Sequence, residues 1–178
     1  MALKATIHKA LLQVADMDRN YYGDHALTVA RHPSETDERM MLRLVVFALH
    51  AHEHLEFGRG LSDSDEPDLW RKDLTGRVQE WIELGQPDER TLLKACGRAD
   101  RVWVYGLGAA FAQWWKAAAP KLERAQNLEV RRIAVTGATP LAALAQRSMQ
   151  LQCTIQERQI WLADGARSVE MEWQSLRG

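Results

Sequence analysis

The chain has 178 residues, 46% of them hydrophobic, which is the size and composition of one compact domain with a sizeable core. Its 23 basic and 24 acidic residues nearly cancel, and a sequence pI near 6.6 excludes a global positive field for holding polyanions. Only two cysteines are present, with no CxxC pair, and the longest apolar run (44–49) is too short to span a bilayer, so we expect a soluble protein of the reduced cytoplasm that does not enter membranes.

The N-terminal third predicts two strands and a long helix. Residues 4–14 and 25–31 are typical of strands, and the turn-forming residues between them indicate an antiparallel pair. Ser34 is the expected N-cap of the helix, with Asp37 as the acidic partner of a capping box. The apolar stripe of this helix is wide, so we expect the helix to be mostly buried. We expect the helix to run to about His54.

The middle of the chain alternates strands with helices. A loop at 58–65 precedes two short strands at 69–74 and 77–84, separated by Thr75-Gly76, and a helix that Pro87 opens and Gly97 can close. A strand at 102–105, a helix at 109–116, a strand at 130–135 and a helix at 139–150 follow. This alternation predicts parallel pairing with crossover helices.

The C-terminal stretch has the period of two that is typical of strands. Leu151, Cys153 and Ile155 share one face, as do apolar residues of a later strand, and Asp164-Gly165 is expected to form a hairpin turn. No repeat, low-complexity tract or long linker interrupts the sequence. We therefore predict one domain over residues 1–178, an α/β (α+β) fold with a mixed β-sheet flanked by helices.

Two carboxylates stand at positions that suit a metal site. Asp68 follows Pro67 at a strand entrance, and Glu83 lies on the next strand of an expected hairpin, where both side chains can reach one hard divalent cation such as Mg²⁺. Bound there, the ion would polarise a phosphodiester and lower the pKa of water. The order of helix, Pro-Asp, strand with Glu83 and capped helix resembles the PD-(D/E)xK nuclease core, in which the main-chain carbonyl of the next residue, here Leu84, also binds metal.

This chain lacks the lysine of that core at its usual position. That lysine would stand two residues after Glu83, where this chain has Gly85. Lys94, on the following helix beside Arg90, can restore the missing charge, because a cation at that edge reaches over the strand ends. Glu38, in the first turn of the first long helix, occupies the place where such folds often put a further acidic residue facing the metal.

Each of these residues also has a purely structural interpretation. On spacing alone, Asp68 and Glu83 are equally well explained as a strand-entry aspartate and an exposed strand glutamate. Arg90 and Lys94 are typical of a solvated helix face, and Glu38 is favoured by the helix dipole. Spacing by itself does not choose between the two interpretations.

Several longer sequence segments resemble those of a known protein family. The segments 53–69 (EHLEFGRGLSDSDEPDL), 70–76 (WRKDLTG) and 81–96 (WIELGQPDERTLLKAC) resemble the YaeQ family of small bacterial proteins, and the resemblance extends to the helix around 38–41 and the strand at 102–106. It implies a single YaeQ-like domain whose fold is a variant of the PD-(D/E)xK nuclease core. It also implies that Asp68 and Glu83 are the two acidic positions and that Lys94 is the displaced lysine.

Two functions of different classes follow. The first is a divergent metal-dependent phosphodiesterase or nuclease acting on DNA or RNA, with Mg²⁺ or Mn²⁺ held by Asp68 and Glu83, and with Lys94, Glu38 and the nucleic-acid-binding Arg90 in support. The second is a non-catalytic protein that binds nucleic acid or the transcription machinery on a nuclease-like fold; the family has been linked to transcription elongation. Fold alone does not separate an enzyme from a binding module.

Other motifs favour structural explanations. His50 and His54 have the i, i+4 spacing of zinc ligands, but the segment is not HExxH and histidines are favoured at a helix C-terminus. Gly106-Leu107-Gly108 lacks the third glycine of a phosphate loop and is better explained as a tight strand-to-helix turn. Two short basic clusters, Arg131-Arg132 and Arg98 with Arg101, suit phosphate contact and surface solvation equally. The seven tryptophans are expected mainly in the core.

Overall fold

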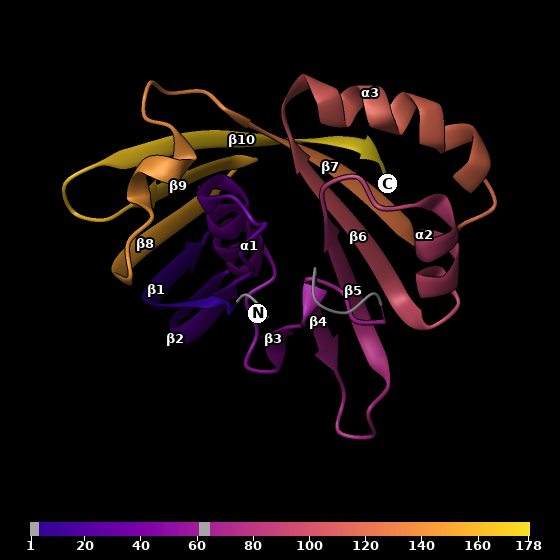
Figure 1. Ribbon diagram of the computed structural model, residues 1–178, viewed down its shortest axis with the longest axis horizontal. Coiled ribbons are helices and arrows are strands. Elements are labelled where there is room, and N and C mark those ends of the chain that lie inside the picture. The colour runs from indigo at the N-terminus through magenta and orange to yellow at the C-terminus, as the bar shows by residue number, and fades with distance from the viewer. Residues whose placement is uncertain (1–3, 61–64) are drawn as a thin grey trace. The chain divides into compact units, whose positions relative to one another are not determined.

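The computed structural model describes residues 4–60 and 65–178 as a mixed α+β protein in which strands predominate and three α-helices occur (Figure 1). The backbone divides into two compact units. Unit 1 comprises residues 1–51 and 135–172, and unit 2 comprises residues 52–134 and 173–178. The expected mixed sheet structure with helices is confirmed at this level.

Unit 1 is built on strands whose order in space is β2-β1-β8-β9-β10. The N-terminal antiparallel pair is confirmed, and it is longer than expected, with continuous register from Thr6↔Arg31 to Asp16↔Tyr21. β1 also pairs in parallel with β8, while β8 with β9 and β9 with β10 pair antiparallel. The bounds are β1 Thr6–Asp16, β2 Tyr21–Arg31, β8 Ser148–Gln156, β9 Gln159–Ala163 and β10 Ser168–Arg177, the last strand ending in unit 2.

The helix of unit 1, α1 (Asp37–Leu49), covers one face of this sheet. Every residue from Met40 to Leu49 is buried, because the helix packs on β1, β2 and β8 and on the short 3-10 helix η3 (Leu141–Leu144). The N-cap is Thr36, whose hydroxyl accepts a hydrogen bond from the Arg39 N–H at 3.1 Å, so the prediction of a Ser34 cap was wrong. Ser34 instead contacts the His32 ring.

The expected helix at 139–150 was wrong as well. The segment forms only η3, and β8 begins at Ser148. Alanine and leucine favour a helix locally, but β8 pairs along its length with β1, from Lys9↔Ser148 to Asp16↔Ile155, and every second residue of β8 is buried. Sheet pairing and burial therefore override local propensity.

Unit 2 has the strand order β7-β6-β5-β4-β3. β3 with β4 and β4 with β5 are antiparallel, whereas β5 with β6 and β6 with β7 are parallel, which confirms the expected crossover connections through α2 and α3. The bounds are β3 Leu55–Phe57, β4 Leu69–Lys72, β5 Val78–Leu84, α2 Glu89–Cys96, β6 Ala99–Leu107, α3 Gly108–Ala118, the 3-10 helix η2 Ala119–Leu122, and β7 Leu128–Val135.

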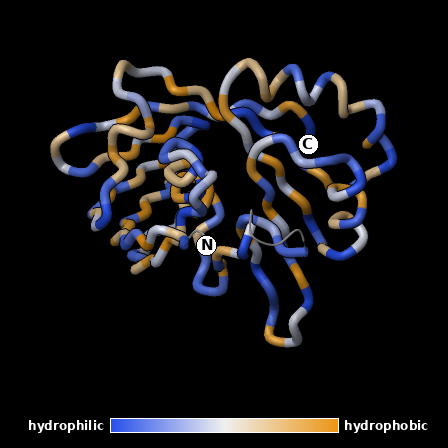
Figure 2. Tube along the Cα trace, viewed as in Figure 1, coloured by the Kyte–Doolittle hydropathy of each residue, from blue (hydrophilic) through white to orange (hydrophobic). Residues whose placement is uncertain are grey.

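The core of unit 2 lies between its strands and helices α2 and α3. Trp81 and Trp70 meet edge to face with their ring centroids 5.8 Å apart, and Leu92, Phe111 and Trp115 belong to the same buried cluster. The tryptophans near this cluster thus pack in the core, as expected. In Figure 2 orange, hydrophobic stretches run along the central strands of this unit. Among the residues that the structure describes, no helix is long and apolar enough to cross a membrane.

Candidate active site

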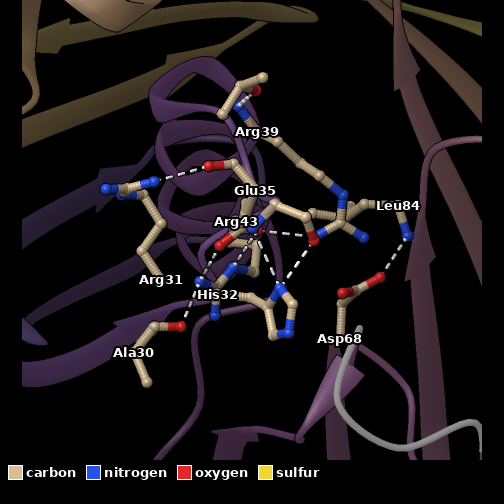
Figure 3. Close-up of polar contacts among 10 residues, drawn as sticks. Ala30, Arg31, His32, Glu35, Arg39, Arg43, Asp68 and Leu84 are labelled. Carbon is tan, nitrogen blue, oxygen red and sulfur yellow. Dashed lines mark hydrogen bonds and ion pairs between the residues drawn. The ribbon is translucent and has the colours of Figure 1, made fainter. Parts of the chain in front are cut away.

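Asp68 is held rigidly at the entrance of β4. Its side chain is buried, and Oδ2 accepts a hydrogen bond of 2.8 Å from the Leu84 N–H (Figure 3). Its main-chain carbonyl accepts one from the Gly58 N–H at 3.0 Å. Gly60, with φ +51°, passes so close that a Cβ there would lie 2.6 Å from Asp68 Oδ1. Backbone groups and a glycine loop therefore fix the direction of this carboxylate.

Glu83 lies on the strand paired with the one that Asp68 opens. The register Leu69↔Ile82 and Trp70↔Trp81, extended by one residue, sets Asp68 opposite Glu83. Directly opposed residues of an antiparallel pair share a sheet face. The half-buried Glu83 side chain accepts a hydrogen bond of 3.0 Å from Trp81 Nε1. The hairpin thus brings the two predicted acids to one end of two adjacent strands.

Gly85 explains why no lysine stands two residues after Glu83. Its φ is +92°, a conformation that side chains rarely adopt, and its N–H donates to the Tyr105 carbonyl at 2.9 Å. A lysine at this position would strain the backbone by about 1 kcal/mol or more. The backbone at this strand end therefore favours glycine over lysine.

Lys94 reaches the segment that leads into Asp68. It lies in the last turn of α2, and its Nζ is 3.7 Å from Oδ1 of Asp65, with both side chains about two-thirds exposed or more. Asp65 was not singled out from sequence, because the loop 58–65 has no periodicity that places it. Arg90, in the first turn of α2, is exposed, and its N–H donates to the N-cap Asp88 at 2.8 Å.

Glu38 belongs to unit 1, where it is exposed in the first turn of α1. That position agrees with a carboxylate favoured by the helix dipole. A different glutamate, Glu35, was missed by sequence reasoning. It is buried just before α1, and its Oε1 lies 2.6 Å from Arg43, while Oε2 lies 2.7 Å from Arg39 (Figure 3). One sequence pattern could have indicated this ion pair: Glu35 precedes a helix and is followed by arginines four and eight residues later.

The histidine segment does not form the expected helix face. α1 ends at Leu49 with His50 as its C-cap, so His50 and His54 are not related by helical spacing. The His52 and His54 rings lie 5.4 Å apart, and burial, followed by the Arg71 guanidinium, lowers the pKa of His52. Within residues 4–60 and 65–178, no cluster of three or more histidine, cysteine, aspartate or glutamate side chains is arranged to hold a metal ion.

The glycine turn and the basic clusters have structural roles. A Cβ on Gly106 would lie 2.0 Å from the Phe111 ring, and Gly108 has φ +79°, so both glycines serve a close strand-to-helix turn. The Arg131 guanidinium stacks over Trp103 at 4.6 Å and over Trp173 at 3.9 Å. Arg131 is half-buried and stacks on two aromatic rings. From the sequence, phosphate contact and surface solvation had suited this arginine equally.

Comparison with known proteins places the chain in a family. The family model described as YaeQ protein matches residues 1–173. A Salmonella typhi relative described as uncharacterized protein YaeQ is 48% identical over 98% of both chains, and one from Escherichia coli (strain K12) is 47% identical with the same coverage. The crystal structure of YaeQ protein from Xanthomonas axonopodis pv. citri has a TM-score of 0.89 at 46% identity, covering 98% of this chain and 99% of that one. The YaeQ protein from Pseudomonas syringae also has a TM-score of 0.89, at 36% identity over 98% and 97% of the two chains. The chain therefore belongs to the YaeQ family.

Proposed function

We propose that this protein is a divergent metal-dependent phosphodiesterase or nuclease acting on DNA or RNA, with Asp68 and Glu83 as ligands of Mg²⁺ or Mn²⁺. The observation that carries the proposal is the buried Asp68 carboxylate, oriented by the Leu84 N–H at 2.8 Å and set opposite Glu83 by the β4–β5 register. Burying a carboxylate is costly, so a chain that does so at a strand end uses it for structure or for chemistry.

The donor set fits a hard divalent cation. Two carboxylates and a main-chain carbonyl, that of Leu84, are the oxygen ligands that Mg²⁺ prefers, with water completing the shell. When bound, the ion would polarise the phosphodiester and acidify water. The chain's own contribution is orientation: the glycine loop at Gly58 and Gly60 holds Asp68, and Trp81 Nε1 holds one oxygen of Glu83.

Lys94 would supply the positive charge that stabilises the phosphorane-like transition state. The left-handed conformation of Gly85 supports this role, because it removes the usual lysine position and leaves α2 as the neighbouring source of a cation. Arg90, one turn earlier on α2 and exposed, would contact the nucleic-acid backbone.

We further infer that the chain carries a variant of the PD-(D/E)xK nuclease core. The supporting features are the chain order α1, Asp68 at the start of β4, Glu83 on the antiparallel β5, and α2 crossing to the parallel β6. The cytoplasm, where bacterial nucleic acids lie, is the compartment that this function requires.

The alternative function is a non-catalytic protein that binds nucleic acid or the transcription machinery. One observation favours it: the Lys94 Nζ lies 3.7 Å from Oδ1 of the exposed Asp65, which is not one of the proposed metal ligands. A core that lost its catalytic lysine at position 85 would keep the fold and bind without cleaving.

Cleavage assays with charge-removing isosteres test the proposal. Purified protein is incubated with single-stranded, double-stranded and branched DNA and with RNA, in Mg²⁺ or Mn²⁺, and metal binding is measured by titration calorimetry. Asp68→Asn and Glu83→Gln should abolish cleavage and weaken Mn²⁺ binding at least about tenfold. Asparagine still accepts the Leu84 hydrogen bond, so lost activity reports lost charge rather than lost structure.

The controls separate the two functions. Glu56→Gln, an exposed change on β3 of the same unit, should leave both readouts unchanged. Lys94→Ala should reduce turnover while sparing Mn²⁺ affinity, whereas Lys116→Ala, exposed on α3, should do neither. Nucleic-acid binding without cleavage of any substrate would reject the enzyme and leave the binding protein; absence of both would reject both functions.

A further inference from the structure

The outer edge of unit 1 is a long strand that lacks most of the usual features that prevent pairing. β2 is the terminal strand in the order β2-β1-β8-β9-β10, and it runs for 11 residues in unbroken register with β1. Natural edge strands are usually shortened, bulged, or marked by proline or lysine to prevent association. The β2 sequence, YYGDHALTVAR, has neither residue and no bulge.

Backbone geometry shows which β2 groups point to this edge. The N–H groups of Lys9 and Met17 donate to carbonyls on the β8 side, so odd residues of β1 direct their polar groups to β8 and even residues direct theirs to β2. The β1–β2 register matches even residues of β1 with odd residues of β2. The even residues of β2 therefore direct their N–H and C=O groups outward. Consistent with this, the Ala30 carbonyl is reached by Arg43 at 2.9 Å rather than by β1.

The side chains of the same even residues are exposed on the outer face of the sheet, opposite α1. Tyr22, Asp24, Ala26, Thr28 and Ala30 all belong to this set. Beside them on β1, Ile7 and Leu11 are 46% and 54% exposed, and Tyr22 is 61% exposed. Half of the large hydrophobic side chains exposed in the described part of the chain thus gather on two neighbouring strands, next to an open edge.

We propose that β2 pairs antiparallel with β2 of a second copy of this chain, with Ala26 on the two-fold axis, so that two unit 1 sheets join. In this register every even residue faces another even residue, so outward N–H and C=O groups meet in hydrogen-bonded pairs. Tyr22 faces Ala30 of the second copy, Asp24 faces Thr28, and Ala26 faces itself. About eight intermolecular hydrogen bonds form when the Ala30 carbonyls stay with Arg43.

The side chains of the outer face match in the same register. Leu11 lies beside Ala26 in each copy, and the two Ala26 side chains meet at the axis. The four residues form one apolar row across four strands. Tyr22 covers Ala30 and, beyond it, Ile7 of the second copy. Between these rows, Lys9 of one copy lies about 10 Å from Asp24 of the other across Thr28, a gap that opposite charges on flexible side chains can close. No like charges face each other.

Charge reversal at the axis tests this pairing. Sedimentation of the full chain across micromolar to high micromolar concentrations should show a monomer–dimer equilibrium. Ala26→Lys and Ala26→Glu each set two like charges opposite each other and should weaken the dimer about tenfold or more. An equimolar mixture of the two variants should restore association as a heterodimer. Gln150→Lys and Gln150→Glu, exposed on the same face but on the central strand β8, are the matched controls and should leave the dimer unchanged.

Amide hydrogen exchange supplies a second readout. The amides of Asp24, Ala26, Thr28 and Ala30 should become protected as protein concentration rises, while those of Gly23, His25 and Leu27 should be protected at every concentration. A protein that stays monomeric throughout, a dimer that both Ala26 variants leave intact, or variants that fail to rescue each other would each overturn the proposal.

Discussion

The two units use buried carboxylates in different ways. In unit 1 the Glu35 carboxylate meets guanidinium groups of Arg43 and Arg39 at 2.6 and 2.7 Å, which is a structural ion pair that ties the start of α1 to its own helix. In unit 2 the Asp68 carboxylate is oriented by a main-chain N–H and a glycine loop at the end of a strand. Burial alone therefore does not distinguish a carboxylate in a structural ion pair from one oriented by the main chain.

The strands of the two units differ as well. β1 alternates buried and exposed residues, because α1 covers only one face of its sheet. β6 buries Val102, Trp103, Val104 and Tyr105 in succession, as expected for a central parallel strand. Unit 1 thus offers a wide exposed face beside an open edge, whereas unit 2 has a central strand with five buried residues in succession.

The largest expected effect concerns thiol accessibility, since each unit contains one cysteine. Burial raises the pKa of Cys153, in β8, to about 12, and burial also raises the pKa of the half-buried Cys96, in α2. In native buffer, iodoacetamide should modify Cys153 at least about a thousandfold more slowly than a free thiol, because reaction requires unit 1 to open. Cys96 should react faster than Cys153. Mass spectrometry of the two peptides gives both rates.

Urea extends this experiment to the unfolding of each unit. If the two units open as one cooperative domain, the two thiols will become reactive at the same urea concentration; separate midpoints will show independent units. The variants Cys96→Ser and Cys153→Ala confirm the assignment of each rate. Fast native labelling of Cys153 would contradict the tight packing of the unit 1 sheet.

Much of this architecture could be predicted from local sequence patterns. The turn residues Thr75-Gly76 predict the β4–β5 hairpin, because turn formation depends on local sequence. The hairpin in turn predicts that Asp68 lies opposite Glu83. The helix expected from Thr139 failed because pairing of β8 with β1 joins residues more than a hundred positions apart, which no local pattern records. The positive φ of Gly85 and the Asp68–Leu84 hydrogen bond were missed for a different reason: they depend on the folded geometry of two strand ends, which residue types alone do not specify.

The next largest effect is expected from the ion pair of unit 1. Glu35→Ala should lower the free energy of unfolding by about 3–5 kcal/mol, because it removes the carboxylate that neutralises the buried Arg43 guanidinium. Chemical denaturation measures the loss. Asp37→Ala is the control, since its contact with Arg31 is 3.4 Å and more than half of the aspartate side chain is exposed, so the change should cost less than about 1 kcal/mol. Equal losses would mean that burial of Glu35 has no energetic consequence.

An intermediate effect is expected where α3 meets β6 in unit 2. Gly106→Ala puts a methyl group 2.0 Å from the Phe111 ring and should cost about 1–3 kcal/mol through overpacking. Gly97→Ala is the matched control, because the C-cap of α2 has φ −80° and the added Cβ makes ordinary contacts from 3.5 Å. In thermal unfolding, the control variant should have a midpoint temperature close to that of the parent protein. In a Phe111→Leu background, the cost of Gly106→Ala should fall, and an unchanged cost would exclude the ring as its cause.

The smallest effect is a pH dependence in unit 1. Burial lowers the pKa of His25, partly opposed by Asp24, and the ring lies between a Tyr21 hydroxyl at 2.7 Å and the edge of Phe47. Because the unfolded state binds this proton more readily, stability should fall as the pH drops below the ordinary histidine pKa of about 6.5 and should level off below the lowered value. The loss should stay below about 1 kcal/mol, since solvent screens a half-buried group. Urea unfolding at about pH 7.5 and pH 5, at low protein concentration, measures it. His25→Gln should reduce the difference between the two pH values, and an unchanged difference would assign it to other groups.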